Sequence, residues 1–189
     1  MSNEVKASSR ERLLEAAATR SYVDGVNIGV EALCKAAGVS KRSMYQLFAS
    51  KDELLAASLE QRAPGFAARL LPPADDVRSP RERIRYVFER VEAEAAAPEY
   101  RGCPYLAVQV ELKDANHPAS KVAHRVKEGL TSFFREEATR GGASDPDLLA
   151  RQLSLVFDGA SARAGIQADA PAGLLGPTVD VLLDAAGVH

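Results

Sequence analysis

The fold of this chain is decided by residues 30–55, which read VEALCKAAGVSKRSMYQLFASKDELL. Apolar residues at i, i+3, i+4 and i+7 open the stretch and predict a short helix with one buried face; they are Val30, Leu33, Cys34 and Ala37. Gly38 follows where a helix ends in a left-handed residue, a conformation that glycine adopts at little cost. Val39 is predicted to fill the space before the next helix, and Ser40 to cap that helix.

The next helix, residues 41–48, is predicted to have one apolar face, with Met44 and Phe48, and one basic, amide-bearing face. Lysine and arginine offer charge to phosphates and donors to guanine edges, glutamine can pair with adenine, and tyrosine can reach a phosphate oxygen. Two helices joined by a short turn that contains glycine, the second with such a face, are typical of helix-turn-helix DNA-binding proteins. The alternative is a plain helical hairpin with a solvated polar face.

Residues 36–51, AAGVSKRSMYQLFASK, resemble the signature of the TetR family of bacterial transcriptional regulators, whose usual text is close to AAGVSKGTLYHHFPSK. The resemblance extends upstream through residues 12–17 and 24–26 and downstream through residues 52–55. It covers the first third of the chain. It implies a homodimeric regulator that binds double-stranded DNA at a palindromic operator, most typically a repressor that a small-molecule effector releases.

The recognition residues follow from this resemblance and from the chemistry of the second helix. We predict base-edge contacts from Arg42, Ser43 and Gln46 and phosphate contacts from Lys41, Tyr45 and Lys51. The chain departs from the usual text at Arg42, at Gln46 with Leu47, and at Ile28 with Gly29, where threonine or serine often caps the helix. The first two departures suggest a particular operator preference.

Lys51 is predicted to lie in the first turn of a fourth helix that Ser50 caps. A cation there opposes the helix dipole, so another group should compensate it. The resemblance implies a DNA phosphate, which a helix N-terminus also favours. Local neutralisation by Asp52 and Glu53 is the alternative.

Composition places the 189-residue chain among ordinary globular proteins, with 46% hydrophobic and 26% charged residues. The formal net charge is -2, yet basic residues outnumber acidic ones up to Lys51, the asymmetry expected when one end of a chain meets phosphate. Cys34 and Cys103 lie far apart and outside any metal-binding spacing. We therefore expect a reduced, cytoplasmic protein with no metal, cofactor or membrane span.

The whole chain is predicted to be all-α, with about nine helices. Residues 1–55 are predicted to form a three-helix DNA-binding module that contains the helix-turn-helix. Residues 56–189 are predicted to form a larger helical bundle for ligand binding and dimerisation. Pro64-Gly65 predicts a kink or break in the fourth helix. Ser79-Pro80 and Asp145-Pro146 each read as a helix start, and Gly141-Gly142 as a stop. Pro171 or Gly176-Pro177 is expected to open the last helix.

The bundle is predicted to supply a dimer interface and an effector pocket. The last two helices have broad apolar faces with small residues, and a palindrome-reading helix-turn-helix needs a two-fold partner. In the resembling family these two helices form a four-helix bundle with their partner's. The predicted interface residues are Leu153, Val156, Ala160, Ala164, Val179, Leu182 and Leu183. The predicted effector contacts, which combine bulk with a few polar groups, are Phe88, Cys103, Tyr105, Gln109, Leu130, Phe134 and Phe157.

Two other classes of function compete with this prediction. An enzyme could pair Cys103 as nucleophile with His117 or His124 as base, but no nucleophile signature surrounds the cysteine and no orienting side chain is suitably spaced. A helical adaptor that binds proteins and not DNA would use the same bundle. The basic outer face of residues 41–48 argues against the adaptor.

Overall fold

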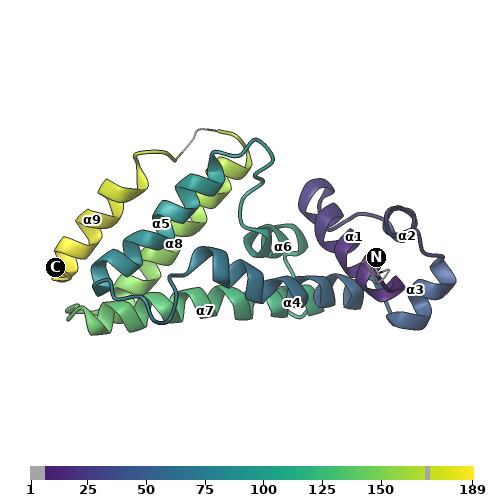
Figure 1. Cartoon of the computed structure of the whole chain (residues 1–189), viewed down its shortest axis with the longest axis horizontal. Helices are drawn as coiled ribbons and strands as arrows, with labels where there is room; N and C mark the ends of the chain where they lie inside the picture. Colours follow the sequence, from purple (N-terminus) through teal and green to yellow (C-terminus); the bar gives the residue numbers. More distant parts are fainter. Residues whose placement is uncertain (1–6, 169–170) are drawn as a thin grey trace, which may run out of the picture. The chain divides into compact units, whose positions relative to one another are not determined.

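The structure is a computed structural model that describes residues 7–168 and 171–189, and these residues form nine α-helices without a strand (Figure 1). The prediction of an all-α fold is confirmed. The helices are α1 (Ser9–Asp24), α2 (Val30–Ala37), α3 (Lys41–Leu47), α4 (Lys51–Leu70), α5 (Pro80–Ala95), α6 (Pro104–Leu112), α7 (Pro118–Arg140), α8 (Pro146–Gly165) and α9 (Leu175–Ala186).

Capping residues begin the helices where the sequence predicted them. The Ser79 side chain accepts from the backbone N–H of Glu82, whose own carboxylate accepts from the Ser79 N–H, and Pro80 occupies the first helical position of α5. Asp145 accepts from the Leu148 N–H at the start of α8. These side chains satisfy amides that have no partner inside their helix, so each start is set locally.

The fourth helix is continuous at the position where the sequence predicted a kink or a break. α4 runs without a break through Pro64, although the missing N–H costs a hydrogen bond. Leu59 and Leu70, on either side of the proline, are each 4% exposed. The last helix begins at Leu175, close to the second of the two predicted starts.

The chain folds into two compact units. The first runs to Ala63 and also takes residues 107–123; the second consists of residues 64–106 and 124–189. The predicted domain boundary after Leu55 stays a prediction, since this division by contacts falls later in α4. Three helices, α4, α6 and α7, contribute residues to both units.

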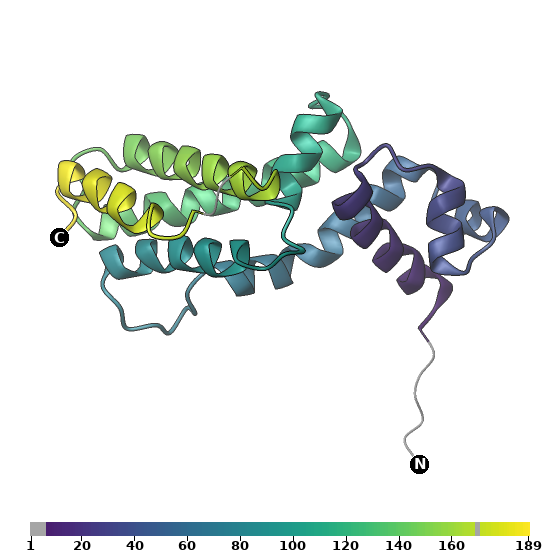
Figure 2. The same ribbon diagram turned by 90° about the horizontal axis from the view of Figure 1, so that it is seen from above.

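The first unit has a continuous core under the helix-turn-helix. Figure 2 shows α1, α2 and α3, coloured purple to blue, as one group, and each of the three contacts the other two. Their apolar faces meet at a set of side chains that are at most 8% exposed: Leu13, Leu14, Ala16, Ala17, Leu33, Cys34, Ala37, Met44, Phe48 and Leu54. Val39 packs against this core, as predicted.

The second unit packs α5, α8 and α9 against one another (Figure 1). Its interior holds Phe88 stacked on Phe134, with ring centroids 5.6 Å apart. Arg81 of α5 donates to Asp180 and Asp184 of α9, at 2.9 Å and 2.6 Å, so that ion pairs reinforce the docking of the last helix. Within the described residues, no helix is both long enough and apolar enough to cross a membrane.

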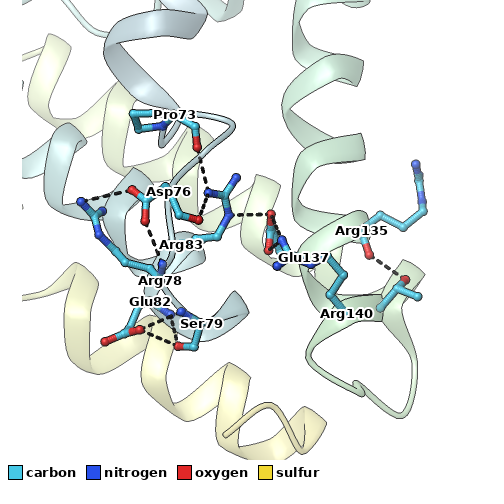
Figure 3. A network of polar contacts seen from close by, with 10 residues as sticks. Pro73, Asp76, Arg78, Ser79, Glu82, Arg83, Arg135, Glu137 and Arg140 are labelled. Atoms are coloured by element: carbon cyan, nitrogen blue, oxygen red, sulfur yellow. Dashed lines mark hydrogen bonds and ion pairs between the residues drawn. The ribbon is translucent and has the colours of Figure 1, made fainter.

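A buried charge network holds the loop before α5 against α7 (Figure 3). The Arg83 Nε donates to Glu137 Oε1 at 2.8 Å, and these two side chains are only 8% and 5% exposed. Arg83 Nη1 also donates to the Pro73 carbonyl at 2.9 Å, and Arg140 donates to the Glu137 carboxylate at 2.8 Å. Both buried charges are therefore paired and hydrogen-bonded, which is what makes their burial tolerable.

Candidate nucleic-acid interface

The turn between α2 and α3 has the geometry that the sequence predicted. Gly38 adopts a left-handed conformation with φ 60° and ψ 39° and ends α2. The Ser40 Oγ accepts from the Ser43 N–H at 3.0 Å, which satisfies a free amide at the start of α3. Two local features thus set where α3 begins: the left-handed backbone of Gly38 and the side-chain cap of Ser40.

The two faces of α3 are sharply different. Met44 is fully buried and Phe48, just beyond the helix, is 3% exposed. Arg42, Tyr45 and Gln46 lie exposed on the other side, with Tyr45 55% exposed. The basic and amide-bearing face is therefore open in the chain, and side chains that can donate to base edges and phosphates line it together.

Lys41 and Ser43 also lie on this helix, each with a partner. The Lys41 ammonium forms an ion pair with Glu31 of α2. The hydrogen bond from Lys41 lowers the pKa of the Glu31 carboxyl, and the same bond raises the pKa of Lys41. Both groups are exposed, so water and salt screen the pair and a phosphate can replace the carboxylate. The Ser43 Oγ lies 2.9 Å from the Ser40 Oγ.

Lys51 has a role that the sequence did not reveal. Its Nζ donates to the carbonyl oxygens of Val26 at 3.1 Å and Ile28 at 3.4 Å, in the loop before α2. These oxygens supply the compensation that a cation in the first turn of α4 requires. Ser50 caps the helix as predicted, accepting from the Glu53 N–H at 3.1 Å. Asp52 and Glu53 are thus not the main counter-charges of Lys51 in this structure.

Residues 107–123 add two contacts to the first unit. Glu111 Oε2 accepts from the Val26 N–H at 2.8 Å. His117 Nε2 lies 3.3 Å from Asp52 Oδ1, while His117 Nδ1 accepts from the Ala119 N–H. The bond to Nδ1 assigns the hydrogen of a neutral imidazole to Nε2, facing Asp52. Sequence reasoning missed these contacts because no local pattern links positions so far apart.

Known proteins match this unit and the chain as a whole. The family model for bacterial regulatory proteins of the tetR family matches residues 13–58, from α1 into α4. The crystal structure of a TetR transcriptional regulator from Streptomyces avermitilis is 73% identical, with a TM-score of 0.96 over 97% of this chain and 100% of that one. The chain belongs to the TetR family. It is a DNA-binding transcriptional regulator.

Other TetR structures share the fold at lower identity. A TetR-family regulator from Streptomyces coelicolor is 24% identical, with a TM-score of 0.83 over 95% of this chain and 96% of that chain. A regulatory protein TetR from Rhodobacter sphaeroides is 25% identical, with a TM-score of 0.72 over 95% and 97%. No curated protein sequence matches the chain. The homologues are transcriptional regulators, a class distinct from enzymes.

In this TetR protein, the second unit buries most of the predicted effector residues. Those in its interior are at most 4% exposed: Phe88, Cys103, Tyr105, Leu130, Phe134 and Phe157. Gln109 instead belongs to the first unit, with residues 107–123. The structure thus brings Phe88 and Phe134 into contact but does not group all seven residues. The effector site stays a prediction.

A charged pair that the sequence did not predict lies in the same unit. The Lys127 ammonium of α7 contacts the Asp158 carboxylate of α8 and lies 4.4 Å from the centre of the Phe157 ring. Burial raises the pKa of the Cys103 thiol, although Lys127 acts in the opposite direction. A buried neutral thiol is a poor nucleophile, which argues against the enzyme alternative. The residues described contain no group of three or more potential metal ligands.

The predicted dimer interface stays a prediction, and the structure shows how exposed its residues are in a single chain. Five of the seven residues lie in the chain's own core and are at most 8% exposed: Leu153, Ala160, Ala164, Val179 and Leu183. Val156 and Leu182 are half-buried. Helical periodicity identified the apolar stripe correctly but cannot tell which partner it faces. The large apolar residues that remain exposed on or next to these helices are Leu148, Leu155, Ile166, Leu174 and Val181.

Proposed function

We propose that this regulator binds a palindromic operator as a homodimer, inserting one copy of α3 into each of two major-groove half-sites, and represses transcription until a small-molecule effector releases it. The open outer face of α3 is the observation that carries the proposal. Repression and release by an effector are typical of the family to which the chain belongs. As a regulator of bacterial genes it would act in the cytoplasm, where the chromosome lies.

The residues of α3 that are proposed to contact DNA divide by reach and chemistry. Arg42, Ser43 and Gln46 are the proposed base-edge contacts, because arginine matches guanine and glutamine matches adenine in the major groove. Lys41 and Tyr45 are proposed to bind phosphates. Lys51 can join them, because an ammonium has three N–H donors and the loop carbonyls use two.

A second copy of the chain fits the exposed face of α8 and α9. On α8 the positions i, i+7, i+11 and i+14 are Leu148, Leu155, Gly159 and Ala162, all exposed and apolar or small. Residues at this spacing form one stripe along the helix, and such a stripe is typical of two helices that pack at a shallow angle. Val181 extends the exposed apolar surface on α9, which contacts α8. A four-helix interface with the partner's α8 and α9 would cover this surface.

The effector is proposed to bind in the second unit. The interior aromatic residues Phe88, Phe134 and Phe157 supply apolar surface, and Lys127 with Asp158 supplies charge. Apolar walls with a few fixed polar groups are the usual composition of small-molecule sites. A ligand would release DNA by binding more tightly to the conformation in which the two α3 helices do not match the operator.

Selection from a random pool of duplexes tests the proposal. The full-length protein is expected to enrich a palindrome whose half-site centres are about one helical turn, roughly 34–36 Å, or a multiple of it apart. Affinity for the enriched duplex should fall steeply with salt. Enrichment of no duplex would refute operator binding, and enrichment of a single asymmetric site would refute the symmetric dimer.

Arg42→Ala is expected to relax specificity at one base pair of each half-site. Loss of a bidentate contact to guanine should cost about 1–3 kcal/mol against the preferred base and little against the others. Fluorescence anisotropy on operator variants changed one base pair at a time measures this. Arg69→Ala, which removes an exposed arginine of α4, is the charge-matched control. If Arg42→Ala discriminates all variants as the wild type does, Arg42 contacts no base.

A further inference from the structure

The loop from Val26 to Ile28, which joins α1 to α2, is held by charged side chains from two other elements. Glu111 Oε2 of α6 accepts from the Val26 N–H at 2.8 Å. Lys51 Nζ of α4 donates to the carbonyl oxygens of Val26 at 3.1 Å and Ile28 at 3.4 Å. The two polar backbone groups of Val26 thus bond to opposite charges, while its side chain is 3% exposed.

This support matters because no side chain caps the start of α2. Gly29 occupies the N-cap position and offers no side-chain hydrogen bond to the first amides. The other helix starts of the recognition region have serine caps, at Ser40 and Ser50. A helix without an N-cap side chain begins less sharply, so the position of the preceding loop decides where α2 starts.

The start of α2 in turn positions the recognition helix. Leu33 and Cys34 of α2 share the core with Met44 of α3. Close packing transmits small shifts between such helices, because a core of interlocked side chains resists independent movement. A displaced loop would therefore move the outer face of α3 relative to the rest of the unit.

The local backbone is shaped to admit the carboxylate. Gly25 has a φ of +88°, and a Cβ built on it would lie 2.8 Å from Glu111 Oε2, closer than atoms approach. Any other residue at this position would push Glu111 away. His117 and Asp52, 3.3 Å apart, join the same segment of residues 107–123 to the first turn of α4.

We infer that Glu111 and Lys51 are positioning residues for operator binding: together they hold the loop from Val26 to Ile28 and, through it, the start of α2. This inference rests on the proposed function and names residues that position its DNA-binding face. Loss of the Glu111 carboxylate frees the start of α2 and weakens the fit of α3 to DNA.

Hydrogen–deuterium exchange of the full-length protein without DNA tests the positioning role. Glu111→Ala is expected to raise exchange about tenfold at the amides of residues 26–33, because a hydrogen bond to a charged group is lost, and to leave other helices unchanged. Glu111→Gln keeps an acceptor oxygen and should show a smaller increase. Glu136→Ala, which removes an exposed carboxylate of α7, is the matched control.

A double-mutant cycle distinguishes this role from general destabilisation. Lys51→Met and Glu111→Gln act on the same loop, so their effects on exchange at residues 26–33 should be non-additive. Additive effects, or a uniform rise in exchange across the chain, would overturn the inference. Unchanged exchange in Glu111→Ala would overturn it as well.

Binding to the duplex selected by the wild type tests the functional step. Glu111→Ala should bind that duplex about tenfold more weakly while discriminating base changes as the wild type does, because ordering the loop now opposes binding. Wild-type affinity in Glu111→Ala would refute the inference and leave the proposed function intact. If the wild type selects no duplex, the proposed function fails, and the exchange experiment alone decides whether Glu111 positions α2.

Discussion

Leu155→Arg is expected to convert the proposed dimer into a monomer and to weaken binding to the proposed palindrome by roughly 10²–10⁴-fold. Leu155 is 73% exposed in the middle of the apolar seam of α8. An arginine there places an unpaired charge where the partner helix would bury it, and the cost of that burial exceeds the gain from the rest of the seam. In a dimer, binding of the first recognition helix makes binding of the second intramolecular, which raises the overall affinity by roughly 10²–10⁴-fold. The monomer loses this gain. Sedimentation equilibrium measures the oligomeric state, and anisotropy measures the affinity.

The controls separate dimerisation from folding and from DNA contact. Val77→Arg makes the same kind of change at a loop residue that is 99% exposed, and it should stay dimeric and bind normally. The Leu155→Arg monomer should bind an isolated half-site with the same affinity as one subunit of the wild type, because its α3 is unchanged. A Leu155→Arg protein that remains dimeric would place the interface on another surface.

Glu137→Ala is expected to lower the free energy of unfolding by about 3–5 kcal/mol, because it leaves the Arg83 guanidinium buried without its partner. At roughly 2–4 °C per kcal/mol for a chain of this size, the melting temperature should fall by about 10 °C. Arg83 would keep only the backbone carbonyls of Pro73 and Asp76 as acceptors. Urea denaturation followed by circular dichroism measures the change.

Two further variants show whether the charge itself is responsible. Glu136→Ala, one residue earlier and exposed, should change stability by no more than about 0.5 kcal/mol. The double variant Arg83→Met with Glu137→Leu removes both charges and fills similar volume, so it should recover most of the loss. If Glu137→Ala matches Glu136→Ala, the buried pair contributes nothing measurable.

The helix-turn-helix could be predicted from the sequence because its determinants are local. Gly38 ends α2, Ser40 caps α3, and Met44 with Phe48 defines the buried side, so the exposed side follows by helical geometry. Each of these features involves residues within a few positions of one another. The resemblance of residues 36–51 to the TetR signature sequence reflects the same short-range constraints.

For the second unit, the sequence predicted the helices but not how they pack against one another. Apolar spacing in α8 predicted a broad buried stripe, but Leu153 faces the chain's own core and Leu155 faces outward. Periodicity gives the direction of a side chain about its helix and not the identity of the element that covers it. Which stripe remains for a partner depends on where α5 and α9 pack.

By itself, the sequence determined the class of fold, the start and end of the recognition helix and the residues that this helix exposes, because caps, glycine conformations and helical period act over a few residues. Only the tertiary structure decided that Lys51 and Glu111 share the Val26 loop, that Arg83 and Glu137 are paired in the interior, and which apolar face is left open. Those outcomes depend on contacts between residues distant in the chain; Val26 and Glu111, for example, are separated by 85 positions. No pattern of neighbouring residues encodes such distances.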